Sequence, residues 1–251
     1  MVAMQGEVRI LEDGAAVAAA AAGEFCRRAV AAVAARGRFA VALSGGSTPR
    51  LLLRELAGGS AVGVPWERVH LFWGDERAVG ADHPDSNFRM VRDELLSRVT
   101  IPAANLHRMR GEGPDWQAAA ADYEAELRDF FALRPRQLPR FDLVFLGMGG
   151  DGHTASLFSG STALTEPDRL VVAPWVARLA AHRLTLTPRL FNAAACVVFL
   201  VTGEDKAAML QRVLEGPRDP RKLPSQSITP VDGELIWLVD IAAAQRLSPR
   251  S

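Results

Sequence analysis

The sequence predicts an α/β fold in which a mostly parallel β-sheet carries helices on both faces. Short apolar runs of strand length recur along the chain. Segments with helical periodicity or helix-capping residues separate these runs, and strands that alternate with helices are typical of a parallel sheet. The chain has no Ser/Gly linker, no break in composition and no internal repeat. We therefore predict a single α/β domain over residues 1–251.

The predicted strands differ in how much of each strand is buried. Residues 7–11 alternate between polar and apolar and suit a half-buried edge strand. Residues 39–43 and 141–146 are apolar enough for strands covered on both faces. Further strands are predicted at residues 69–73, 170–173, 184–186, 196–201 and 236–239.

Capping residues limit the predicted helices. Asp13 suits the start of an Ala-rich helix, and Gly37 suits its end. Pro49 suits the first position of a second helix that begins near residue 48, and Ser86 can cap a third. The third helix reaches about residue 98, and further helices are predicted at 116–133, at 204–214 and after residue 239. Residues 74–85, 101–115 and 216–224 are predicted to be irregular.

Composition excludes several partners. The chain has 29 Lys plus Arg and 29 Asp plus Glu, so its net charge indicates neither a nucleic-acid nor a membrane-surface partner, although a local cluster can still bind an anion. Charged residues interrupt the apolar stretch 15–35, which argues against a membrane span. Cys26 and Cys196 lie in apolar stretches and are expected to be free thiols. With no signal-peptide pattern at the start, we predict a cytoplasmic protein.

Residues 141–158 predict the floor of a binding site. An apolar run is followed by glycines at 147, 149, 150 and 152, with Asp151 among them and His153 directly after. Glycines allow a sharp turn, and ligands bind at the carboxyl ends of strands in open α/β sheets. The G-x-G-x-x-G spacing also matches a dinucleotide fingerprint, but Gly160 follows too soon for the long helix that such a site requires. No P-loop and no metal-ligand spacing of histidines is present, so we predict no cofactor and no metal.

Other polar groups follow other predicted strands. Ser44, Gly45, Gly46, Ser47 and Thr48 offer amides, hydroxyls and a helix N-terminus, which suit a phosphate. The same loop could instead be a turn capped by its own hydroxyls, and Ala42 stands where a serine-hydrolase elbow needs glycine.

Charged residues also follow strands. Asp75, Glu76 and Arg77 form either a solvated loop or a charged cluster over the same floor. From local sequence, Arg183 and Lys206 are single surface cations near strand ends.

Taken together, these stretches resemble the 6-phosphogluconolactonase family, in the family's order and over nearly the whole chain. The resemblance rests on LSGGSTPRLL (43–52), FWGDERAV (72–79), DSNFRM (85–90), LGMGGDGHTASLF (146–158), HRLTLT (182–187), VTGEDKAAML (201–210), PSQSI (224–228) and WLVD (237–240). It implies a Rossmann-like three-layer α/β/α fold. It also implies hydrolysis of 6-phospho-D-glucono-1,5-lactone, a phosphosugar lactone, to 6-phospho-D-gluconate in the oxidative pentose phosphate pathway.

The resemblance and the residue chemistry suggest roles for these groups. Imidazole can act as a base near neutral pH, so His153 is our candidate to activate water. Either Asp151 or Asp75 would orient it, and Arg77 would stabilise the tetrahedral oxyanion. The phosphate would bind at residues 44–48, with Arg183 and Lys206 at positions that match phosphate-binding residues of the family.

Two alternatives stay open at this point. The related glucosamine-6-phosphate deaminases usually carry Glu seven residues after the Asp of DGH, where this chain has Phe158, which favours the lactonase over a deaminase or isomerase. A non-catalytic phosphosugar sensor would be expected to carry a DNA-binding module, for which the chain has no candidate segment.

Ser159 replaces the family's usual Pro and predicts an altered loop. A monomer or a small homo-oligomer fits the sequence equally well.

Overall fold

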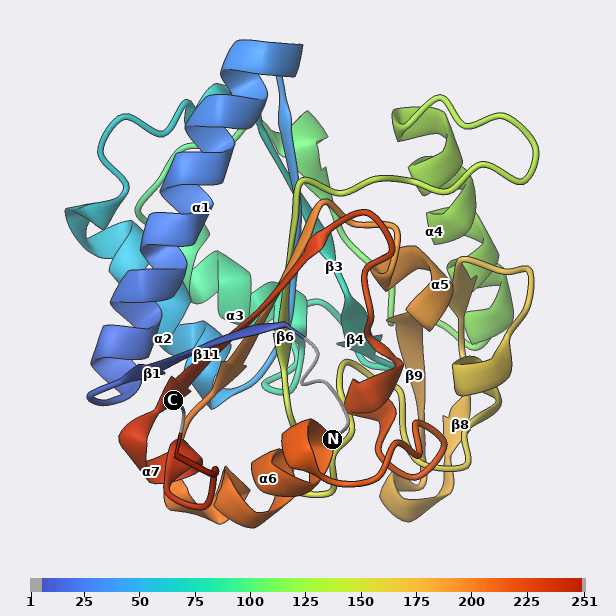
Figure 1. Ribbon diagram of the computed structural model, residues 1–251. Helices are drawn as coiled ribbons and strands as arrows, with labels where there is room; N and C mark the ends of the chain where they lie inside the picture. Colours follow the sequence, from blue (N-terminus) through green and yellow to red (C-terminus); the bar gives the residue numbers. More distant parts are fainter. Residues whose placement is uncertain (1–5, 250–251) are drawn as a thin grey trace.

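A parallel sheet of seven strands forms the centre of the structure, a computed structural model that describes residues 6–249 (Figure 1). The order across the sheet is β1-β11-β10-β6-β2-β3-β5. The strands are β1 (Glu7–Leu11), β2 (Phe39–Leu43), β3 (Val69–Trp73), β5 (Leu106–His107), β6 (Leu143–Gly147), β10 (Cys196–Val201) and β11 (Glu234–Asp240). The predicted edge position of residues 7–11 is confirmed. The ends of the predicted 1–251 domain lie outside the described residues.

The strand order reverses between β2 and β6. From β2 the chain moves outward through β3 to β5, then returns to β6 on the other side of β2 and continues to β10 and β11. At such a switch point the loops after two adjacent parallel strands diverge and leave a crevice where ligands bind. The segments that meet there are residues 44–48 after β2 and 148–153 after β6.

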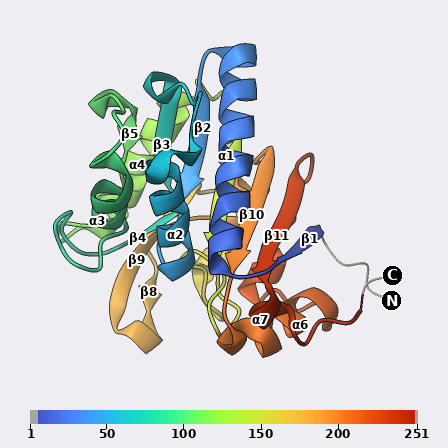
Figure 2. The same cartoon turned by 90° about the vertical axis from the view of Figure 1, so that its left-hand side faces the viewer.

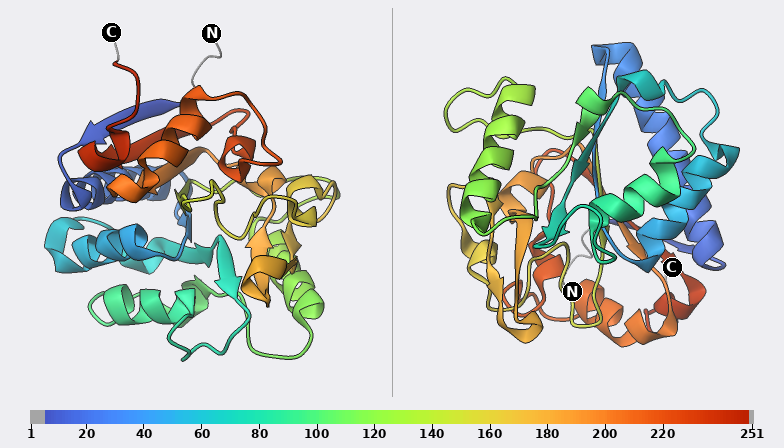
Figure 3. Two further views of the ribbon diagram at one scale, coloured as in Figure 1. Left: turned by 90° about the horizontal axis from the view of Figure 1, so that it is seen from below. Right: turned by 180° about the vertical axis from the view of Figure 1, so that it is seen from behind.

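Helices cover both faces of the sheet, so the predicted three-layer α/β/α class is confirmed. Helices α1, α2 and α3 lie along one face, and α4 lies on the other (Figures 2 and 3). The helices are α1 (Gly14–Arg36), α2 (Ser47–Glu55), α3 (Asn87–Val91), α4 (Trp116–Phe130), α5 (Pro188–Phe191), α6 (Ala207–Glu215) and α7 (Ile241–Ala244). Within residues 6–249 no helix combines the length and the apolar character needed to cross a bilayer.

The predicted caps are present. The Asp13 side chain accepts a hydrogen bond from the Ala16 amide at 2.8 Å, and Gly37 ends α1 with a left-handed φ of 75°. The Ser86 side chain accepts from the Arg89 amide at the start of α3. Each cap satisfies a backbone group that has no partner inside the helix, which fixes where the helix begins or ends.

A second, antiparallel sheet lies beside α4 and was not predicted. It contains β4 (Asp75–Arg77), β7 (Val171–Val172), β8 (Trp175–Val176) and β9 (Ala181–Leu186). The prediction that 74–85 and 101–115 are irregular is therefore wrong at β4 and β5. Both strands are short and have no apolar alternation of their own. They form because partners distant in sequence offer hydrogen bonds, β9 for β4 and β3 for β5.

Three side chains at the β3–β5 edge, His70, His107 and Glu126, lie in a hydrogen-bonded series. This series predicts that the folded protein loses stability in acid. His70 Nδ1 lies 3.1 Å from His107 Nε2, and His107 Nδ1 lies 2.6 Å from Glu126 Oε1. Burial, His107 and Arg38 lower the pKa of His70 to about 4 from 6.5. The unfolded chain therefore binds the His70 proton more readily between these values, and folding stability falls as the pH falls from about 6.5 to about 4.

We expect the thermal unfolding midpoint to drop over this pH range, and the drop to be smaller in His70→Gln, which cannot be protonated. The matched variant His83→Gln removes an exposed imidazole and should keep the wild-type pH dependence. Calorimetry or circular dichroism at several pH values measures the difference. An equal pH dependence in wild type and His70→Gln would contradict this account.

Candidate active site

A cavity of about 230 Å³ opens at the switch point of the sheet. It is lined by segments that follow β2, β3, β6 and β10, as expected for a ligand site in an open parallel sheet. Most of the residues predicted from the sequence face this one cavity, namely Ser44, Gly45, Gly46, Ser47, Thr48, Asp75, Arg77, His153 and Lys206. Asp151 and Arg183 are not part of the lining.

The loop after β2 presents the N-terminus of α2 to the cavity. Gly46 precedes the helix with a φ of 116°, which only glycine adopts readily, and no side chain caps the helix. Amides of the first turn are thus available to an anion. Ser47 is exposed, whereas the Ser44 hydroxyl donates to the Phe145 carbonyl at 2.6 Å. Ser44 therefore holds the loop against β6, and its hydroxyl proton is engaged in this hydrogen bond.

The turn after β6 presents His153. The Gly149 amide donates to the His153 carbonyl at 2.9 Å, and Gly152 has a φ of 82°. A Cβ on Gly149 would lie 2.1 Å from His153 Nδ1, so only glycine leaves room for the imidazole in this position. The glycines predicted to expose the histidine thus do so by two means, a left-handed turn and a close approach.

Asp151 contacts His153 directly. Its Oδ1 accepts from the His153 amide at 3.3 Å and pairs with His153 Nδ1. Burial acts to raise the pKa of Asp151, but the hydrogen bonds of His153 and the charge of Arg178 lower it below its ordinary value. The carboxylate is therefore ionised at neutral pH and holds Nδ1. Among the described residues no contact engages Nε2, which leaves that nitrogen for a proton transfer.

Arg178 is a site residue that the sequence analysis missed. Its guanidinium pairs with Asp151 Oδ2, lies 3.5 Å from His153 Nδ1 and stacks over the Phe158 ring at 4.5 Å. Phe158 in turn lies 4.3 Å from the His153 ring. Arg178 belongs to a short turn between β8 and β9, and no motif marks it. Only the fold of the second sheet brings it to the histidine.

Asp75 is buried and held from two sides. Ser156 Oγ donates to its carboxylate at 2.6 Å, and Asn87 Nδ2 donates to its backbone carbonyl at 2.8 Å. Within the part of the chain that the structure describes, it forms no hydrogen bond with His153. Of the two acids that the sequence left open, Asp151 is the one that contacts the imidazole.

Two arginines lie side by side on the second sheet. Arg77 on β4 pairs in register with Arg183 on β9, and Arg77 Nη1 donates to the Asp85 carbonyl at 2.6 Å. Burial and the charge of Arg77 lower the pKa of Arg183 below its ordinary value. An anion between them would relieve this repulsion. Lys206, after β10, also lines the cavity and pairs with Asp205 at 2.9 Å.

Comparisons with known proteins find similarity to a single family. The profile of the family described as glucosamine-6-phosphate isomerases/6-phosphogluconolactonase matches residues 12–237. A 6-phosphogluconolactonase of Synechocystis sp. is 46% identical over 222 residues, which cover 88% of this chain and 90% of that protein. The human 6-phosphogluconolactonase is 39% identical, with 97% of this chain and 94% of that protein covered.

Solved structures show the same similarity in three dimensions. The 6-phosphogluconolactonase from Trypanosoma cruzi superposes with a TM-score of 0.88 at 26% sequence identity, and the alignment covers 99% of each chain. The similarity therefore includes the second sheet as well as the central one.

Proposed function

The chain belongs to the glucosamine-6-phosphate isomerase/6-phosphogluconolactonase family, and we infer from this premise and from its site how it acts. It hydrolyses 6-phospho-D-glucono-1,5-lactone to 6-phospho-D-gluconate, a step of the pentose phosphate pathway. The observation that carries the mechanism is the His153–Asp151 pair beside a cavity that Arg77 and the N-terminus of α2 also line.

The reaction needs a water molecule made nucleophilic. In our proposal His153 Nε2 accepts a proton from water while the water oxygen forms a bond to the lactone carbonyl carbon. Asp151 holds the opposite ring nitrogen and stabilises the imidazolium that forms. Arg178, paired with the other oxygen of Asp151, keeps that carboxylate ionised and fixed in orientation.

The carbonyl oxygen becomes negatively charged in the tetrahedral intermediate. Arg77 lines the cavity and is our candidate to stabilise this charge. The intermediate then collapses as the bond from carbon to the ring oxygen breaks. The imidazolium returns its proton to that oxygen, which becomes a hydroxyl, and the new carboxyl group ionises.

We propose that the phosphate binds at residues 44–48, with Lys206 and Arg183 as cations. Lys206→Ala and Arg183→Ala are expected to raise KM about tenfold each and to change kcat little, because the phosphate is held equally in the ground and transition states. Initial rates over a range of lactone concentrations measure this. Arg36→Ala, an exposed cation paired with Asp142 away from the cavity, should leave both constants unchanged. An unchanged KM in both Lys206→Ala and Arg183→Ala would contradict the phosphate assignment.

A coupled assay tests the function itself. The lactone is made in situ, and its disappearance is followed with and without protein, because it also hydrolyses spontaneously. Faster hydrolysis with protein is expected. Ammonia release from glucosamine 6-phosphate would instead support a deaminase, which Phe158 argues against because an apolar ring lies beside His153 in place of an acid. Tight binding without turnover would support a sensor.

We further propose a cytoplasmic protein with no nucleic-acid partner, which the free Cys26 and Cys196 and the zero net charge support. The single-domain organisation and a monomer or small homo-oligomer stay predictions.

A further inference from the structure

Glu76 lies between Asp75 and Arg77 on β4, yet it does not line the cavity. Side chains of neighbouring strand residues point to opposite faces, so Glu76 points away from the cavity when its two neighbours face it. The residue is 2% exposed. We propose that Glu76 is a positioning residue that sets the orientation of the Arg77 guanidinium and of the Asp75 carboxylate. This inference rests on the role proposed above for Arg77.

The Glu76 carboxylate accepts four hydrogen bonds. Oε1 accepts from the Arg77 amide at 2.8 Å and the Asn87 amide at 2.7 Å. Oε2 accepts from the Phe88 amide at 2.8 Å and the Ser86 hydroxyl at 3.1 Å. No ion pair involves Glu76 within residues 6–249. Since every partner donates, both oxygens must accept, and a glutamine side chain could satisfy only one of the two positions.

Three of these bonds, from Ser86, Asn87 and Phe88, join β4 to the start of α3. The turn that leads into α3, residues 82–87, also holds Asp75 and Arg77, the two neighbours of Glu76. The Asp85 carbonyl accepts from Arg77 Nη1 at 2.6 Å, and Asn87 Nδ2 donates to the Asp75 carbonyl at 2.8 Å. A shift of the turn relative to β4 would therefore move both the guanidinium and the carboxylate. Glu76 is the buried group that prevents such a shift.

Asn87 also packs closely against residues 44–48, the segment proposed to bind the phosphate. Asn87 is fully buried, and a Cβ on Gly45 would lie only 1.8 Å from its Oδ1. The turn that Glu76 holds is thus in contact with residues 44–48 as well as with Asp75 and Arg77.

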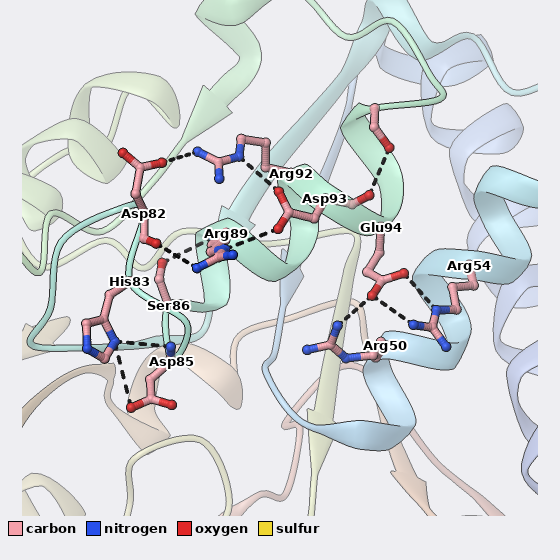
Figure 4. Close-up of polar contacts among 11 residues, drawn as sticks. Arg50, Arg54, Asp82, His83, Asp85, Ser86, Arg89, Arg92, Asp93 and Glu94 are labelled. Carbon is pink, nitrogen blue, oxygen red and sulfur yellow. Dashed lines mark hydrogen bonds and ion pairs between the residues drawn. The ribbon is translucent and has the colours of Figure 1, made fainter.

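Exposed ion pairs hold the outer side of the same turn (Figure 4). Arg89 Nη1 donates to the Asp82 carbonyl at 2.8 Å, and Arg92 pairs with Asp82 and Asp93. Exposed pairs of this kind contribute little to stability or rigidity. The buried carboxylate is the stronger constraint. Burial raises the pKa of Glu76 above its ordinary value, and the hydrogen bonds from the amides of Asn87, Phe88 and Arg77 lessen the rise.

Glu76→Gln tests the proposal in a double-mutant cycle with Arg77→Ala. We expect Glu76→Gln to lower kcat about 100-fold, the size of effect that a misplacement near 1 Å can produce, with little change in KM. In the Arg77→Ala background it should lower kcat only slightly further, because residues that act as a unit are not additive. The unfolding midpoint should fall equally in both backgrounds.

Glu24→Gln is the matched control. Glu24 on α1 is also 2% exposed, but it pairs with Arg9 of β1 and with Arg27 and Arg28 of α1, and it does not line the cavity. It should lower the unfolding midpoint and keep kcat. If Glu76→Gln does not fold, Ser86→Ala replaces it, since it removes one donor to Oε2. Its expected loss in kcat is about fivefold, and that loss should vanish in the Arg77→Ala background.

The outcomes separate the possible failures. Normal kcat in Glu76→Gln, or an equal loss of kcat with and without Arg77, would overturn the positioning role. Normal kcat in Arg77→Ala would instead contradict the role proposed for Arg77 and the inference with it. A wild-type protein without lactonase activity would contradict the proposed function at its base.

Discussion

Replacing His153 by alanine is expected to lower kcat for lactone hydrolysis by about 100-fold or more, the contribution typical of a general base. The imidazole is held by Asp151 at Nδ1 and contacts the Phe158 ring, so Nε2 is the nitrogen open to water. The side chain is only half-buried, and the turn around it is fixed by backbone bonds such as that of Gly149. The fold should therefore survive the substitution.

The measurement is kcat in the coupled assay after subtraction of spontaneous hydrolysis, together with the thermal unfolding midpoint of each variant. His83→Ala provides the control, because His83 is an exposed histidine that does not line the cavity. It should retain wild-type turnover. Turnover near the wild-type level in His153→Ala would remove this residue from the role of base and would leave Asp75, also in the cavity, as the group to test next.

Apart from β5, the central sheet could be predicted because its strands are defined by their own residues. Residues 39–43, 69–73 and 196–201 are mostly apolar runs, and the strands have these limits in the structure. The start of β6 was predicted two residues early, because Phe141 is buried without being part of the strand. Strand β4 was missed because its three residues are all charged. Its pairing with β9 is a tertiary effect that local pattern does not contain.

The residues of the site also fall into those whose position could be predicted from the sequence and those whose position could not. The predicted site residues lie shortly after parallel strands, and the carboxyl ends of parallel strands meet at one edge of a sheet, so their proximity could be inferred. These residues are 44–48, Asp75, Arg77 and His153. Arg178 and Asn87 could not be found in this way. Arg178 reaches the histidine through a turn of the second sheet, and Asn87 reaches Asp75 from the start of a helix.

Replacing Arg77 by alanine is the second change with a large expected effect. The guanidinium is held by the Asp85 carbonyl, and the amide of Arg77 by Glu76, so the charge is fixed before substrate binds. A donor held in place for a developing oxyanion contributes ~3 kcal/mol, and its loss should lower kcat by about 100-fold. Arg77→Lys retains the charge but not the planar fork, and it should recover only part of the rate.

Arg92→Ala controls for a general effect of removing a guanidinium from this region. Arg92 pairs with Asp82 and Asp93 on the outer side of the same turn (Figure 4), and its removal should leave kcat close to wild type. Arg77 also adjoins Arg183, so a loss confined to KM in Arg77→Ala would mean that both arginines bind the phosphate. A loss in kcat with KM preserved is the result that our proposal requires, because the oxyanion exists only after the water has attacked.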